Sequence, residues 1–113
     1  MSNHVHLLIN PLNNNLSDII KSIKLSFFKR YNYSKNHKIR KIWQSRFWDH
    51  VIRDERDFKN HLNYIHFNPV KHGYTRIPYE YEFSSYKHYL ERGYYTEEWG
   101  VINKIEISGE FGE

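Results

Sequence analysis

The sequence predicts a single small α+β domain, and three observations lead to this prediction. The chain has 113 residues, which is enough for one compact core. Aromatic side chains make up 18% of it, far more than a disordered chain contains. Strand-like segments alternate with segments whose apolar residues recur every three or four positions, as they do on one face of a helix.

The first predicted element is a strand over residues 4–9. This segment is rich in aliphatic and β-branched residues, and Asn10 and Pro11 follow it as a turn signal. Alternate residues of a strand point to the same side of it. His4, His6 and Leu8 are therefore expected to share one face.

A helix and a second extended segment are predicted next. The helix has Ser17 as a plausible N-cap and ends before Asn36, because apolar residues between them recur at helical spacing. Residues 42–52 are dense in aromatic and β-branched side chains, so we expect a bent strand there. The polar face of the helix carries several lysines.

Two further helices complete the predicted elements. One begins at the N-cap Asp54, and we expect Pro69 to end it because the residue before a proline is pushed out of the α region. Its apolar stripe is formed by Phe58, Leu62 and Ile65. A short helix then runs from Ser84 or Ser85 to Arg92, with Gly93 as a left-handed cap. Residues 1–100 are predicted to form the domain and residues 101–113 an acidic tail that frays.

Composition excludes several classes of protein. The chain contains no cysteine, so disulfides, thiol nucleophiles and thiolate metal sites are excluded. It also has no run of about 20 apolar residues that would span a bilayer, and no signal-peptide pattern at residues 1–6. We therefore expect a cytoplasmic protein without a membrane partner.

The net charge of +4 is unevenly distributed. Residues 21–59 carry 12 basic and 4 acidic side chains, a net of +8, whereas residues 77–113 carry 3 basic and 8 acidic ones, a net of −5. Basic residues interleaved with aromatic ones suit a phosphate backbone with stacked bases, and equally suit a solvated helix face followed by a core strand. The candidate DNA-binding residues are Lys21, Lys24, Lys29, Arg30, Lys41, Trp43, Arg46, Trp48, Arg53 and Lys71.

Two local patterns carry possible chemistry. Imidazoles at positions i and i+2 of a strand, such as His4 and His6, can chelate one divalent ion. Tyr64 and Asn68 are one helical turn apart and share a face, so their oxygens can approach one ion together. The ordinary alternatives stay open, since a tyrosine is more often a half-buried core residue and Asn68 suits a helix end.

Four segments in order resemble the REP-associated tyrosine transposases, which belong to the HUH single-tyrosine transposases. They read NHVHLLI at residues 3–9, IWQSRFWDHVIRDE at 42–55, YIHFNPVKHG at 64–73 and SSY at 84–86. The resemblance implies that Tyr64 attacks DNA and that His4, His6 and Asn68 bind a divalent metal, Mg²⁺ or Mn²⁺. It also implies single-stranded or hairpin DNA as substrate, a 5′-phosphotyrosine intermediate and strand transfer. The alternative is a catalytically inactive remnant that still binds such DNA.

The same resemblance implies a ferredoxin-like sheet, in which a strand-helix-strand unit precedes the HUH strand. Because the HUH strand begins here at residue 4, we expect an N-terminally short form of this domain. A sheet without its central strands exposes strand edges and apolar surface. Three outcomes are open: an inactive remnant, a homodimer that completes the sheet between chains, or a rearranged smaller fold.

Overall fold

The computed structural model describes residues 3–35 and 42–100 of the chain. These residues form two compact units. Unit 1 contains residues 3–8 and 49–100, and unit 2 contains residues 9–35 and 42–48. The predicted acidic tail lies outside the described residues, and the predicted domain boundary at residue 100 stays a prediction.

Unit 2 is built on one long helix, α1 (Leu16–Lys35). Half-buried side chains recur along it at helical spacing, at Ile20, Lys24, Phe28 and Tyr31. The indole Nε1 of Trp43 donates a 3.1 Å hydrogen bond to the main-chain oxygen of Lys24, which ties the segment after the helix to this face. The helix prediction is confirmed, although α1 begins at Leu16, so residue 17 lies inside the first turn and is not the N-cap.

Unit 1 is organised around α2 (Glu55–Lys71), and its predicted start is confirmed. Asp54 is the N-cap, and its side-chain oxygen accepts a 2.8 Å hydrogen bond from the main-chain nitrogen of Asp57. Asp57 in turn accepts from the main-chain nitrogen of Arg53 at 3.0 Å. The two bonds satisfy the main-chain donors of Asp57 and Arg53 at the start of the helix.

The predicted end of this helix is wrong, because α2 continues through Pro69 to Lys71. A proline inside a helix removes one hydrogen bond, here to the carbonyl of Ile65, and the α conformation of the preceding residue is disfavoured but not forbidden. Two features offset this cost: Pro69 is fully buried, and its carbonyl accepts a 2.9 Å hydrogen bond from Tyr74. Gly73, with a φ of 77°, supplies the left-handed residue that ends the helix.

The rest of unit 1 packs on the C-terminal half of α2. A 3-10 helix, η1 (Pro78–Glu80), contacts both α2 and the short helix α3 (Tyr86–Glu91). The prediction for α3 is confirmed: Ser85 is its N-cap, and Gly93, with a φ of 81°, follows its C-cap. The buried side chains of α2 are Leu62, Tyr64, His66, Asn68 and Pro69. Of the predicted apolar stripe only Leu62 is buried, whereas Phe58 and Ile65 are half-buried.

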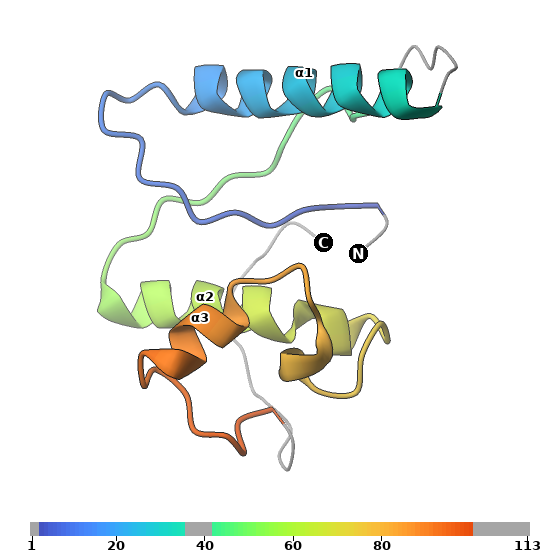
Figure 1. Ribbon diagram of the computed structural model, residues 1–113. Coiled ribbons are helices and arrows are strands. Elements are labelled where there is room, and N and C mark those ends of the chain that lie inside the picture. Colours follow the sequence, from blue (N-terminus) through green and yellow to red (C-terminus); the bar gives the residue numbers. More distant parts are fainter. Residues whose placement is uncertain (1–2, 36–41, 101–113) are drawn as a thin grey trace. The chain divides into compact units, whose positions relative to one another are not determined.

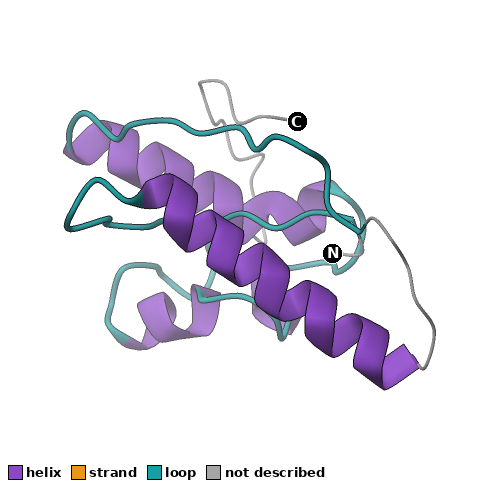
Figure 2. Cartoon of the chain, turned by 90° about the horizontal axis from the view of Figure 1, so that it is seen from above, coloured by secondary structure: helices purple, strands orange, loops and turns teal. Residues whose placement is uncertain are grey.

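The described residues contain helices and no strand, so the predicted α+β class is not confirmed (Figure 2). Residues 4–9 and 42–52 are irregular, and both strand predictions fail for the same reason. A strand is defined by a ladder of hydrogen bonds to a neighbouring strand, and no two described segments form one. His4 and His6 are nevertheless half-buried while Val5 and Leu7 are exposed, so the predicted alternation holds over residues 4–7. It fails at Leu8, which is exposed. The ferredoxin-like sheet, and its completion by a second copy, stay predictions.

Hydropathy along the described helices is low. None of them is both long and apolar enough to cross a lipid bilayer.

Candidate active site

Helix α2 carries the tyrosine and the asparagine that the sequence singled out. Tyr64 is 6% exposed and Asn68 is fully buried, and both lie on the same face because they are four residues apart. Asn68 is therefore not the residue that caps the helix, since α2 ends three residues later. A fully buried amide needs polar partners, because burying it without them costs free energy.

The two histidines near the start of the chain lie against this face of α2. The Nε2 atom of His4 is 3.1 Å from Oδ1 of Asn68. The imidazole ring of His6 packs edge-on against the ring of Tyr64, with 5.4 Å between centroids, and against His4 at 5.0 Å. Unit 1 thus brings together the pair His4 and His6 and the pair Tyr64 and Asn68. The two pairs are about 60 positions apart in the sequence.

Two further side chains complete the surroundings of this group. Lys71 donates a hydrogen bond from Nζ to the Tyr64 hydroxyl at 3.2 Å. The ring of His72, the residue that caps α2, lies edge-on to that of His4 at 5.2 Å. The sequence analysis predicted that Lys71 contacts DNA, and it proposed no function for His72. The spacing of seven between Tyr64 and Lys71, two helical turns, is the signal that would have paired them.

Behind the site, a buried histidine holds α2 to the rest of unit 1. His66 is fully buried. The hydroxyl of Tyr95 donates to Oδ1 of Asn63 at 3.0 Å, so it accepts from Nδ1 of His66 at 2.8 Å. Nε2 of His66 then accepts from the Ser85 hydroxyl at 2.8 Å. Burial lowers the pKa of His66 to about 4, because the charged form would lose its hydration, so the ring is neutral at pH 7.

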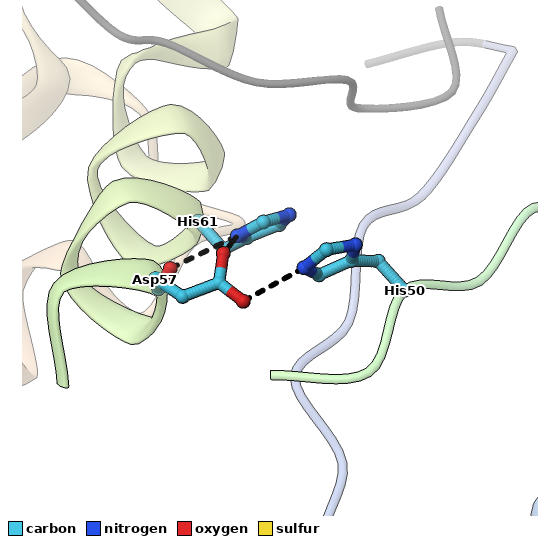
Figure 3. Close-up of side chains that lie close together, drawn as sticks. All are labelled: His50, Asp57 and His61. Atoms are coloured by element: carbon cyan, nitrogen blue, oxygen red, sulfur yellow. Dashed lines mark hydrogen bonds and ion pairs between the residues drawn. The ribbon is translucent and has the colours of Figure 1, made fainter. Parts of the chain in front are cut away.

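A second cluster of titratable groups lies at the N-terminal end of α2 (Figure 3). Asp57 faces two imidazoles: Nε2 of His50 is 2.8 Å from Oδ2, and Nδ1 of His61 is 3.1 Å from Oδ1. Two hydrogen bonds lower the pKa of Asp57. The larger effect comes from His50 and the smaller from the main-chain nitrogen of Arg53. The sequence analysis did not find this cluster, although Asp57 and His61 have the four-residue spacing of one helix face.

The candidate DNA-binding residues are divided between the two units, and Lys41 lies outside the described residues. In unit 2, a groove between α1 and residues 42–47 is lined by Lys21, Lys24, Phe28, Trp43 and Phe47 among others. Lys24 and Trp43 also bond within the unit, since Nζ of Lys24 donates to the main-chain oxygen of Gln44 at 3.0 Å. Exposed side chains belong to Lys21, Lys29, Arg30, Arg46 and Trp48 of unit 2, and to Arg53 and Lys71 of unit 1.

Comparison with known proteins identifies the family. Residues 1–66 match the family described as "Transposase IS200 like". A Haemophilus influenzae protein named as a REP-associated tyrosine transposase is 38% identical over 120 residues, which cover 97% of this chain and 68% of that protein. The REP-associated tyrosine transposase of Escherichia coli is 41% identical over 61 residues, or 54% of this chain and 37% of that protein. No solved structure is significantly similar to the chain.

The chain therefore belongs to the IS200-like transposases and, among them, to the REP-associated tyrosine transposases. The family predicted from the four sequence segments is confirmed.

Proposed function

We propose that this chain is a metal-dependent DNA endonuclease and strand transferase whose nucleophile is Tyr64. The observation that carries the proposal is the proximity of His4, His6 and Asn68 to the Tyr64 side chain in a member of a transposase family. The alternative, a DNA-binding remnant without catalysis, is not favoured by the family match. The substrate we propose is single-stranded or hairpin DNA, whose unpaired bases are accessible for stacking.

The donor set near Tyr64 suits a divalent metal. His4 Nε2 and Asn68 Oδ1 are 3.1 Å apart, which is the separation of two ligand atoms that share one ion, and His6 offers a second imidazole beside them. Nitrogen and amide-oxygen donors fit Mn²⁺ and are compatible with Mg²⁺. Bound by these three residues, the ion would polarise a non-bridging oxygen of the scissile phosphate and make its phosphorus more electrophilic.

The side chains themselves perform the transfer. The oxygen of Tyr64 attacks the phosphorus and forms a phosphotyrosine bond to the 5′ side of the DNA, while the bond from phosphorus to the 3′ oxygen breaks. The phenol proton is released to solvent and the 3′ oxygen takes up a proton. In the second step the 3′ hydroxyl of another strand attacks the phosphotyrosine, and Tyr64 leaves. Lys71, which donates to the Tyr64 oxygen, stabilises the negative charge on that oxygen in both steps.

The test is covalent capture of DNA. The wild type, Tyr64→Phe and the matched control Tyr79→Phe are incubated with a hairpin-bearing single-stranded oligonucleotide and Mn²⁺, then denatured and separated by mass. Tyr79 is 52% exposed, so its hydroxyl is dispensable for the fold. We expect an adduct in the wild type and the control, its loss in Tyr64→Phe, and its loss on addition of a chelator. An adduct that persists in Tyr64→Phe, or none in the wild type, would contradict the proposal.

A further inference from the structure

The cluster at the N-terminal end of α2 has the donor set of a metal site. His50 lies in the loop before the helix, while Asp57 and His61 lie on its first two turns (Figure 3). The ligand atoms of these three residues all lie within 4.8 Å of one another. All three belong to unit 1, and they are distinct from the residues proposed to hold the catalytic metal.

We propose that His50, Asp57 and His61 form a second divalent-metal site, which takes a first-row transition ion such as Zn²⁺. Two imidazoles and one carboxylate are donors that zinc accepts readily. Ligand atoms about 2.0 to 2.2 Å from one zinc ion stand roughly 3.3 to 3.6 Å from each other in a tetrahedral arrangement. Nε2 of His50 is 2.8 Å from Oδ2 of Asp57, and Nδ1 of His61 is 3.1 Å from Oδ1, so these atoms move apart by a few tenths of an ångström to hold the ion.

The exposure of the three side chains and the orientation of His50 support the same conclusion. Nε2 of His50 faces the Asp57 carboxylate at 2.8 Å. Nδ1 of His61 lies between this carboxylate and the main-chain oxygen of Asp57, 2.9 Å away, and gives up the main-chain contact when it binds an ion. Side-chain exposures of 25% for His50, 19% for Asp57 and 12% for His61 leave a path for an ion and water while shielding the ligands from bulk solvent. This partial burial also strengthens the attraction between the carboxylate and a cation.

The imidazole rings of His50 and His61 lie side by side. They stack with centroids 4.4 Å apart and an interplanar angle of 13°. A metal ion lies in the plane of the imidazole ring that binds it, so one ring turns out of this stack when both bind the same ion. The bound ion would fasten the loop at His50 to the start of α2, so its role is structural and it is not part of the transfer chemistry.

Zinc binding to the chelator-treated full chain tests the site. Bound zinc per chain is measured by competition with a chromophoric chelator for the wild type, His50→Gln, His61→Gln and His4→Gln. His88→Gln is the matched control, because His88 is exposed and its ring contacts only Tyr89 among the described aromatic pairs. Circular dichroism and the Tm of each metal-free variant establish that it folds.

We expect His50→Gln and His61→Gln each to bind one equivalent less than the wild type, and His88→Gln and the wild type to bind equally. His4→Gln should still bind the zinc equivalent that His50→Gln and His61→Gln lose. The zinc bound at this cluster can therefore be measured independently of the proposed catalytic metal. Zinc should also raise the Tm of the wild type by more than that of His50→Gln. Equal stoichiometry in the wild type and both cluster variants, or no zinc bound by the wild type, would overturn the proposal.

Discussion

The ammonium group of Lys71 donates a hydrogen bond to the hydroxyl of Tyr64, with 3.2 Å between Nζ and the phenol oxygen. The same nitrogen lies 4.9 Å from the centre of the Tyr64 ring. A lysine in this position contacts the tyrosine itself, whereas the sequence predicted a contact to DNA. The two roles can be separated experimentally.

Replacing Lys71 with methionine should slow covalent capture of DNA with little effect on DNA affinity. A hydrogen bond from a charged donor contributes about 1.5 to 3 kcal/mol, which corresponds to roughly a 10- to 100-fold lower rate. Rates of adduct formation are measured for the wild type, Lys71→Met and Lys71→Arg, and Kd is measured in the Tyr64→Phe background. Lys59→Met, on the exposed face of the same helix, is the control. If Lys71→Met weakens binding by as much as it slows capture, Lys71 is only a DNA contact.

Asn68 provides a test of the metal-binding group that does not alter the tyrosine. Asn68→Asp keeps an oxygen near His4 and should retain adduct formation, whereas Asn68→Leu has a similar volume and no oxygen and should lose it. The measurement is the Mn²⁺ concentration that gives half-maximal adduct, with the Tm as a check on folding. Equal metal dependence in Asn68→Leu and the wild type would exclude Asn68 as a ligand.

The buried His66 predicts how stability depends on pH. Its pKa of about 4 in the folded chain lies below the ordinary value of 6.5, so the unfolded chain binds more protons between these two values. The contribution of His66 is therefore fully present above pH 6.5 and is lost as the pH falls toward 4. The total is of the order of 3 kcal/mol, since each pKa unit corresponds to about 1.4 kcal/mol.

Urea unfolding of the wild type and His66→Gln between pH 7 and pH 4 measures this effect. The free energy of unfolding should fall more steeply for the wild type, because glutamine does not titrate. His88→Gln should follow the wild type, since His88 is exposed. Parallel curves for the wild type and His66→Gln would show that His66 does not titrate as its burial predicts.

The groove in unit 2 predicts a dependence of DNA binding on Lys21. If a phosphate lies against this lysine, Lys21→Gln should reduce the slope of log Kd against log salt concentration by about 0.7, the value for one contact to a single strand. Filter binding of a single-stranded oligonucleotide at several salt concentrations measures the slope. Lys87→Gln, a change on α3 outside the groove, should leave it unaltered. A slope for Lys21→Gln equal to that of the wild type would remove Lys21 from the interface.

Local sequence signals predicted the helices well. The cap at Asp54 and the glycine at position 93 act through hydrogen bonds and backbone conformations within a few residues, so a single segment contains the information. Pro69 misled the prediction because its burial depends on tertiary packing, which the local sequence does not show. Residues 4–9 misled it because a strand depends on a partner strand elsewhere in the chain.

The candidate site was predictable only in part. Helical spacing puts Tyr64 and Asn68 on one face, but nothing local relates them to His4, about 60 positions earlier. That pairing came from the resemblance to a family, and the 3.1 Å separation between His4 and Asn68 agrees with it. The partners of His66 could not be predicted, because Tyr95 lies 29 residues further along the chain. Nothing local distinguishes Tyr95 from the other nine tyrosines as its partner.

The most direct measurement is to map the site of DNA attachment. The adduct formed with Mn²⁺ is digested with nuclease and protease, and the peptide that carries the residual nucleotide is sequenced by mass spectrometry. We predict a single modified residue, Tyr64, joined through its oxygen to a 5′ phosphate, with a free 3′ hydroxyl on the released strand. A nucleotide attached to any of the other nine tyrosines, or cleavage that leaves no nucleotide on the protein, would contradict the assignment of Tyr64 as the nucleophile.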